Sequence, residues 1–222
     1  MRWTSPGALL GAILVALVLA AALTGAVWTP YDPLQIDFAA RFAPPGARHL
    51  LGADAFGRDV LSRLMAGAST SVMISLLTVT LATGLGSGLG LLTGYVRGWT
   101  DRTIMAFINA LLAFPGILLA LGLLAVIGAN KYGIVAALSI AYTPVVTRMV
   151  RGVVLSLRER EFVEASRIMG NSPIHTMLVH VLPNCVAPIT VLASSMFGWV
   201  ILAESALSFV GLGVPSPAPT WG

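Results

Sequence analysis

Charged residues are scarce in this 222-residue chain. Only 10% of its residues are Asp, Glu, Lys or Arg, whereas 57% are hydrophobic. A typical soluble globular domain carries roughly 25% charged residues, and a soluble fold of this length has too little interior to bury so much apolar surface. The composition therefore excludes an ordinary soluble domain and indicates a membrane protein.

Several other features are missing from the sequence. Cys185 is the single cysteine, so no disulfide can form within the chain. The sequence contains no G-x-x-x-x-G-K-[ST] motif for ATP, no H-E-x-x-H motif and no nucleophile–base pattern. His175 and His180 have no carboxylate or cysteine at ligand spacing. Basic runs with interleaved aromatic residues are also missing. We therefore predict a chain that is not an enzyme, binds no cofactor or metal and has no nucleic-acid partner.

Long apolar stretches take the place of charge. A helix needs about 20 apolar residues to cross roughly 30 Å of hydrocarbon. We predict an all-α, polytopic membrane helix bundle with five visible spans, near residues 8–28, 71–96, 103–129, 132–152 and 184–213. The first stretch is longer than the apolar region of a signal peptide, which is about 7–15 residues, so we expect an uncleaved anchor. Pro115, Pro144 and Pro188 predict kinks within spans.

The placement of the arginines predicts the orientation. With a cytoplasmic N-terminus, the inside segments hold Arg2, Arg97, Arg102, Arg148, Arg151, Arg158, Arg160 and Arg167. The other basic residues lie outside, where four aspartates balance the four arginines of one segment. We expect three parts: residues 1–30 with the first span, an extracytoplasmic segment 31–68, and a transmembrane domain 69–222. Arg148 is expected to snorkel to the interface at the end of its span.

Two features within the spans carry further expectations. Gly84, Gly86, Gly88, Gly90 and Gly94 give overlapping small-xxx-small spacings, which predict close helix packing. Glu204 is the only acid deep in a predicted span. Such an acid is either functional or simply held by neighbouring hydroxyls such as those of Ser205 and Ser208.

The end of the chain has an unusual composition. Five spans would place the C-terminus outside, directly after "GVPSPAPTWG". The three prolines at 215, 217 and 219 predict an extended link. We therefore expect a sixth span to follow.

The charge that the chain does have gathers in "LREREFVEASRIMGNSPIHTMLVHVLPN", residues 157–184. The spacing predicts a cytoplasmic helix from about Ser156, with an i,i+4 pair between Arg160 and Glu164. Its apolar face comprises Phe162, Ala165, Ile168 and Met169. Gly170 then caps the helix, Ser172 is an N-cap and Pro173 takes the first helical position. A second amphipathic helix follows, with Ile174, Met177, Leu178, Val181 and Leu182 on one stripe, and stops near Pro183.

Helix, tight turn and helix together allow two interpretations. An amphipathic connector at the membrane interface would have this pattern. A rigid corner that docks a partner would have it too, because amphipathicity shows only that one face is covered. The restart at Ser172 and Pro173 makes a projecting corner, which favours docking.

The same residues resemble the EAA loop of ABC-importer permeases. That pattern is Glu-Ala-Ala, three residues, Gly, nine residues, Ile, one residue and Leu-Pro. Its intervals match Glu164-Ala165-Ser166, Gly170 and Leu182-Pro183, with Ser166 at the second Ala and His180 at the Ile. "HVLPN" is similar to the dipeptide, oligopeptide and nickel branch. The resemblance implies a type I importer fold, in which this corner fits a groove on the ATPase subunit and transmits its closure. Glu164, Ala165, Ser166 and Gly170 would shape the corner, and Asn171, Ser172, Pro173 and Ile174 would lie near the ATPase.

A second segment, "HLLGADAFGRDVLSRLMAGAST" (residues 49–70), resembles His-Pro-Leu-Gly-Thr-Asp-x-x-Gly-Arg-Asp-Val-Leu-Ser-Arg of that branch. The match includes Gly57, Arg58 and Asp59. We expect a self-neutralising external helix with an i,i+4 pair between Asp59 and Arg63, packed on the bundle rather than touching a delivery protein. Residues 109–123 and 201–214 also resemble the branch, although Asn109 stands where an Asp is common.

The resemblance implies a permease subunit of an ATP-driven importer in a bacterial or archaeal inner membrane. Its cargo would be peptides or similar small polar solutes. Its partners would be a second homologous permease, two ABC ATPase subunits that carry ATP and Mg, and an extracytoplasmic substrate-binding protein. The alternatives are an ATP-independent secondary transporter or channel, for which one glutamate provides few coupling groups, and a non-transporting scaffold.

Overall fold

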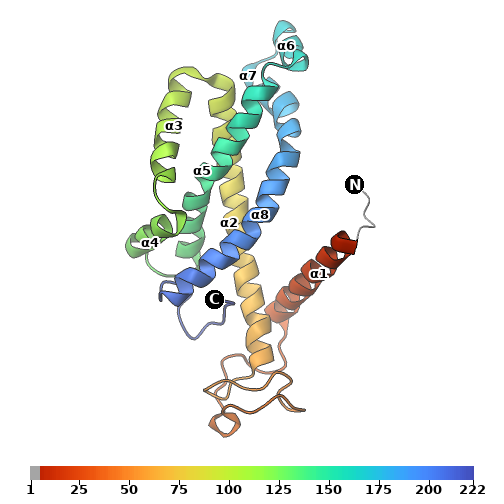
Figure 1. Ribbon diagram of the computed structural model, residues 1–222, viewed down its shortest axis with the longest axis vertical. Coiled ribbons are helices and arrows are strands. Elements are labelled where there is room, and N and C mark those ends of the chain that lie inside the picture. Colours follow the sequence, from red (N-terminus) through yellow and green to blue (C-terminus); the bar gives the residue numbers. More distant parts are fainter. Residues whose placement is uncertain (1–5) are drawn as a thin grey trace. The chain divides into compact units, whose positions relative to one another are not determined.

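The computed structural model describes residues 6–222 and consists mainly of helices (Figure 1). Arg2, which helped to predict the orientation, lies outside the described residues. The elements are α1 (Pro6–Val27), η1 (Phe38–Ala40), α2 (Val60–Val96), α3 (Gly98–Leu112), α4 (Gly116–Ile127), α5 (Lys131–Leu157), α6 (Glu161–Ile168), α7 (Pro173–His175), η2 (Thr176–Val181) and α8 (Leu182–Phe209). The predicted all-α class is confirmed.

Four helical runs within residues 6–222 are long and apolar enough to cross a membrane: α1, α2, α5 and the continuous run Pro173–Phe209. The predicted third span, 103–129, is not one helix. It is divided into α3 and α4, which are bent by 94° at a short break. Pro115 explains the break, because it lacks an N–H and disfavours the helical conformation at Phe114. Counting the bent pair as one span gives five candidates.

α2 begins at Val60, well before the predicted start near residue 71. The carboxylate of Asp59 accounts for the early start, because it accepts the Ser62 backbone N–H at 2.8 Å in the manner of an N-cap. A capped first turn satisfies an N–H group that would otherwise have no partner. Of the segment 49–70 that was expected to be an external helix, residues 49–59 are not helical, and residues 60–70 are the first turns of a much longer helix.

The prediction that a helix stops near Pro183 is wrong. α7, η2 and α8 form one continuous helical run, and η2 is a π-helical turn directly before the proline. The N–H of Leu182 bonds to the carbonyl of Met177, five residues earlier. A wider turn accommodates a residue that donates no hydrogen bond and whose ring crowds the preceding turn. Pro144 and Pro188 lie inside α5 and α8.

The chain divides into two compact units. One comprises residues 75–203 and the other comprises residues up to 74 together with 204–222. Within the first unit α3 and α4 pack on α5, which has the largest buried share of the candidate spans, 67% of its most apolar window, against 6% for α1. Figure 1 shows α6 at one end of this unit and α4 at the other.

The packing of α2 against α5 depends on one row of glycines. A Cβ placed on Gly86, Gly90 or Gly94 would lie 2.5–2.7 Å from the Cβ of Val146, Val150 or Val154 respectively. Gly84 and Gly88 have no other heavy atom within 4 Å of that position. Of the overlapping small-residue spacings in the sequence, the 86/90/94 row therefore makes the close approach, one residue per helical turn.

We expect Gly90→Ala to lower the free energy of unfolding by about 1–3 kcal/mol, because the new methyl would overlap Val150 and the carbonyl of Thr147. Gly88→Ala is the matched control on the same helix, and it should be neutral or stabilising by up to about 1 kcal/mol. Thermal unfolding in detergent would measure both. Equal effects of the two changes would contradict the packing described.

Candidate functional site

The segment 158–182 forms a corner of two helical arms. The turn between the arms has the predicted conformation, but the predicted apolar face of the first arm is not the buried one. α6 begins at Glu161 rather than near Ser156, because α5 continues to Leu157. Gly170 has φ +80°, and its N–H bonds to Arg167 O while the N–H of Asn171 bonds to Ser166 O. This pair of bonds is a Schellman motif, which requires a left-handed residue at Gly170.

The second arm restarts within two residues. The Ser172 Oγ accepts the His175 backbone N–H at 3.2 Å, and Pro173 stands at the first helical position. Ser172 and Pro173 therefore have the local roles predicted for them. Because both ends of the turn are capped, no backbone freedom is left between the two arms.

A buried polar cluster joins the arms. Ser166 is fully buried. Its Oγ lies 3.0 Å from the Thr176 Oγ1 and accepts a hydrogen bond from the Asn171 Nδ2 at 3.1 Å. Thr176, also fully buried, was missed by sequence reasoning. The only available signal was a hydroxyl on the otherwise apolar side of the second arm.

The predicted apolar stripe of α6 does not form its buried face. Val163 and Ser166 are fully buried, whereas Phe162 is 40% exposed, Ile168 80% and Met169 70%. Ala165 and Glu164 are exposed as well. On the second arm Ile174 and Leu178 are 65% and 53% exposed, while Val181 is buried. The helix is amphipathic as predicted, but this chain leaves its apolar side uncovered. We name the exposed set Phe162, Ile168, Met169, Ile174 and Leu178 the corner surface.

Tyr95 at the end of α2 anchors the corner. Its hydroxyl oxygen accepts the Arg167 Nε–H at 3.2 Å, and the Arg167 guanidinium lies 4.9 Å from its ring centroid. The Arg158 guanidinium donates to the Tyr95 carbonyl at 3.2 Å. These residues and Asn171 line a pocket of about 350 Å³. The predicted pair between Arg160 and Glu164 is not among the ion pairs of residues 6–222.

The end of the corner enters the membrane through Leu182, which is half-buried, and Pro183, which is exposed. His175 and His180 stack edge to face, with ring centroids 5.9 Å apart. Within residues 6–222 no group of three His, Cys, Asp or Glu side chains is placed to hold a metal ion.

The segment 31–68 has a different charge arrangement from the one predicted. Asp59 pairs with His49 at 2.9 Å rather than with Arg63, and Arg63 lies 3.7 Å from Asp54. Arg58 pairs with Asp54 at 2.7 Å and covers the ring of Phe56. Chain reversal through residues 54–58, where the Asp54 N–H bonds to the Arg58 carbonyl, brings His49 to Asp59, a contact that helical spacing could not indicate.

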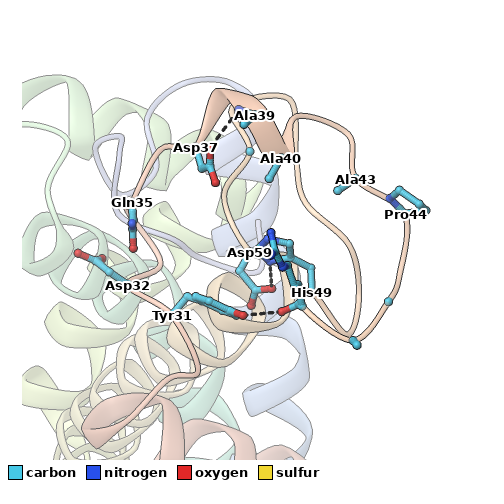
Figure 2. Close-up of a pocket in the computed structure, with 14 residues that line it drawn as sticks. Tyr31, Asp32, Gln35, Asp37, Ala39, Ala40, Ala43, Pro44, His49 and Asp59 are labelled. Carbon is cyan, nitrogen blue, oxygen red and sulfur yellow. Dashed lines mark hydrogen bonds and ion pairs between the residues drawn. The ribbon is translucent and has the colours of Figure 1, made fainter.

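Gly57 allows two parts of this segment to touch. It has φ +75°, and a Cβ there would overlap the carbonyl of Asp37. The segment encloses a pocket of about 700 Å³ (Figure 2). Tyr31 and His49 stack at 5.0 Å on its wall, and the Tyr31 hydroxyl donates to the carbonyl of Arg48 at 2.6 Å.

Asp59 is the most buried acid of the segment. It is 3% exposed and its Oδ2 accepts both the N–H and the Oγ–H of Ser62. Burial alone would raise the pKa of Asp59, but the hydrogen bonds from Ser62 and His49 outweigh it and hold the pKa below its ordinary value of 3.8. The charged form is thus the one that the fold stabilises.

Glu204 is fully buried in α8. Its carboxylate accepts hydrogen bonds from the Ser71 Oγ at 3.2 Å and from the Ser208 Oγ at 3.0 Å. The Ser71 Oγ in turn accepts the backbone N–H of Trp221 at 3.1 Å. Ser208 was one of the two hydroxyls expected from the sequence, whereas Ser71 is distant in the chain. The contacts satisfy Glu204 locally, and a functional role for it stays a prediction.

Two arginines of α5 have contrasting partners. Arg151 donates to both carboxylate oxygens of Asp101, at 2.7 and 2.8 Å. Arg148 donates to the amide oxygen of Asn109 at 2.8 Å. Because Asn109 lies eight residues further along α3 than Asp101, the Arg148 side chain extends away from the 158–182 corner. The expectation that it snorkels toward that side is therefore wrong. Side chains on a helix lean toward its N-terminus. The N-terminus of α5 is the end away from the 158–182 corner.

A model of binding-protein-dependent transport system inner membrane components matches residues 86–222. The chain belongs to this family. The match covers the EAA-like corner and thus confirms the resemblance read from its spacing.

Individual relatives extend the likeness over nearly the whole chain. A protein of Brucella suis biovar 1, provisionally named a peptide transport system permease, is 39% identical over 96% of this chain and 72% of its own length. A dipeptide transport system permease of Alkalihalophilus pseudofirmus is 37% identical over 97% of this chain and 71% of its own. A glutathione transport system permease of Pectobacterium atrosepticum is 37% identical over 95% and 70%.

The fold also resembles that of a solved transporter. A chain of the inward-facing MetNI methionine ABC transporter superposes with a TM-score of 0.60 at 20% identity, covering 68% of this chain and 76% of that one. At this identity the likeness concerns the fold. The family match and the apolar helices together identify a multi-pass membrane component of a transport system.

Acid should loosen the segment 31–68 through Asp59. A carboxylate whose folded pKa is depressed stabilises the fold fully above its unfolded pKa, near 3.8, and that stability is lost as pH falls through the lower folded pKa. We expect Asp59→Asn to cost about 2 kcal/mol at pH 7 and to flatten the loss of Tm between about pH 5 and 3. Asp32→Asn, an exposed acid of the same segment, is the control. An unchanged pH profile in Asp59→Asn would refute this role.

The buried cluster of the corner predicts a non-additive pair. Ser166→Ala should destabilise the corner by about 1–3 kcal/mol, because it leaves Thr176 and Asn171 without their partner. Adding Thr176→Val should restore part of that loss, since both buried hydroxyls are then gone. Tm in detergent and the rate of proteolysis at the corner would report both effects, with exposed Ala165→Ser as control. Strict additivity would count against the cluster.

Proposed function

We propose that the chain is a permease subunit of an ATP-driven importer that moves peptides or similar small polar solutes across a bacterial or archaeal cytoplasmic membrane. Three kinds of partner complete it: a second homologous permease, two ABC ATPase subunits that bind ATP and Mg, and an extracytoplasmic substrate-binding protein. The N-terminus and residues 156–182 lie on the cytoplasmic side. The relatives named for peptide, dipeptide and glutathione transport support this cargo class.

The corner surface is the observation that carries the proposal. Ile168, Met169 and Ile174 are each at least 65% exposed on a turn whose two ends are capped. An exposed apolar set of this kind, on a backbone that is already fixed, suits an interface that pays little ordering entropy on docking. A membrane-surface connector has no need of the buried Ser166 cluster or of the Tyr95 anchor, which set the angle of the corner.

The mechanism follows from the rigidity of the corner. ATP-driven closure of the two ATPase subunits draws the corners of both permeases together. Because the second arm is continuous with α8, the movement passes directly into the membrane helices and opens the shared path outward. ATP hydrolysis releases the ATPases and resets the path. In this scheme Glu164, Ala165 and Gly170 shape the docking edge, and Asn171, Ser172, Pro173 and Ile174 contact the ATPase.

Substitution of Gly170 tests this coupling. We expect Gly170→Val to reduce ATP-dependent uptake at least tenfold while ATP hydrolysis by the assembled complex persists, because a β-branched residue at φ +80° forces the corner out of shape. Gly152→Val in α5 is the matched control, since a Cβ there meets no other heavy atom within 4 Å.

The experiment uses the tagged chain purified with its native partners in mild detergent, with mass spectrometry of the proteins that accompany it. ATPase subunits and a second permease are the expected companions. Transport that continues unchanged in Gly170→Val, or that needs no ATPase, would support the channel alternative instead.

A further inference from the structure

Arg148 carries a positive charge that no acid neutralises. Among the ion pairs of residues 6–222, Arg151 has Asp101 as its partner and Arg148 has none. The contact of Arg148 is the neutral amide oxygen of Asn109, at 2.8 Å. One turn of α5 thus separates a compensated guanidinium from an uncompensated one.

The uncompensated charge lies deep along the helices. Asn109 is six residues inside the expected span 103–129, or about 9 Å from its start at 1.5 Å per residue, within a hydrocarbon core of roughly 30 Å. The Arg148 side chain reaches that level by leaning toward the N-terminus of α5. In the proposed orientation its guanidinium therefore lies within the hydrocarbon core and not at its edge.

Both partners are exposed on the surface of their unit. A guanidinium has five N–H donors, and the contact with Asn109 uses one of them. A cation at such a depth is strongly disfavoured against lipid, so cations of this kind face a bundle interior or a water-filled path. The exposed side of Arg148 is thus expected to face water or the partner permease.

We propose that Arg148 and Asn109 form a subsite for a carboxylate of the cargo on the translocation path. This inference rests on the proposed function, because it assigns the site to a peptide importer. The planar fork of an arginine matches a carboxylate through two parallel hydrogen bonds. Asn109 holds the fork with its amide oxygen and has its NH₂ group left as a further donor. Every peptide with a free C-terminus supplies the matching anion.

The identity of residue 109 is what leaves the site open. An aspartate would occupy the guanidinium as Asp101 occupies that of Arg151 at 2.7 and 2.8 Å. The asparagine of this chain orients Arg148 without neutralising it. Asparagine and aspartate differ by a single charge and have nearly equal volume. Exchanging one for the other at position 109 therefore provides the sharpest test.

The experiment uses the complete transporter with its partner subunits and receptor in proteoliposomes and measures ATP-driven uptake of radiolabelled dialanine. We expect Arg148→Gln and Asn109→Asp each to lower initial uptake about tenfold or more at limiting substrate, with ATP hydrolysis by the complex retained. Arg148→Lys should keep part of the uptake. Arg102→Gln, an exposed cation of α3, is the control and should leave uptake unchanged.

Asn109→Asp distinguishes a binding role from a structural one. A purely structural contact would be kept or strengthened by an aspartate, so unchanged uptake in this variant would overturn the subsite. A second readout tests the exposure to water: the thiol of Arg148→Cys should react with a negatively charged, water-soluble methanethiosulfonate, against the unaltered chain, in which Cys185 is fully buried. Absence of labelling would place residue 148 against lipid or protein and would also overturn the subsite.

The failure of the proposed function gives a different result. If the unaltered transporter takes up no dialanine in the presence of ATP, the peptide-import function is wrong and the subsite fails with it. If the unaltered transporter imports dialanine and all variants match it, only the subsite is wrong.

Discussion

A bilayer offers no hydrogen-bond partner to the backbone, and the fold described here depends on meeting that constraint within each segment. Prolines are the places where this is hardest, and the chain solves the problem in two ways. At Pro115 the helix ends and a new one begins at 94° to it. At Pro183 the helix continues, because the preceding turn widens to a π-helical one. The same residue type thus divides a helix in one place and is accommodated within a continuous helical run in the other.

Polar side chains are few, and nearly all of those described fix the place where a helix begins, ends or turns. Asp59 starts α2, Tyr95 ties the end of α2 to the corner, and Ser166 joins the two arms of the corner. Each contact is buried or half-buried, where a hydrogen bond to a charged or otherwise unsatisfied group contributes most. The apolar residues set where the helices lie, and these polar residues set where the helices begin and turn.

Local signals in the sequence predicted local structure well. The spans followed from length and apolarity, and the turn followed from Gly170, Ser172 and Pro173, because φ preference and capping are properties of one or two residues. Partner choice was less accessible. Helical spacing predicted Asp59 with Arg63, but His49 takes that position after a chain reversal.

The face of α6 shows a different limit. Periodicity correctly identified an apolar stripe through Phe162, Ile168 and Met169, but it cannot say whether the chain itself covers such a stripe. The long-range contact of Tyr95 with Arg167 had no signal in a single sequence, and the contact of Thr176 with Ser166 had only the Thr176 hydroxyl as its signal. Depth was misjudged for a similar reason: snorkelling is a property of the side chain, whereas the direction taken by Arg148 is fixed by the polarity of its helix and by Asn109.

The π-helical turn at Thr176–Val181 also has a mechanical consequence. Because the helical run is continuous from Pro173 to Phe209, no non-helical linker separates the outer arm from the expected span. A flexible linker of the same length would bend and so absorb a displacement of a few ångströms. A continuous helix transmits the displacement as a rotation of the whole helix. The stiffness of this one turn thus determines how much of a movement applied to the corner outside the membrane reaches the part of the helix inside the membrane.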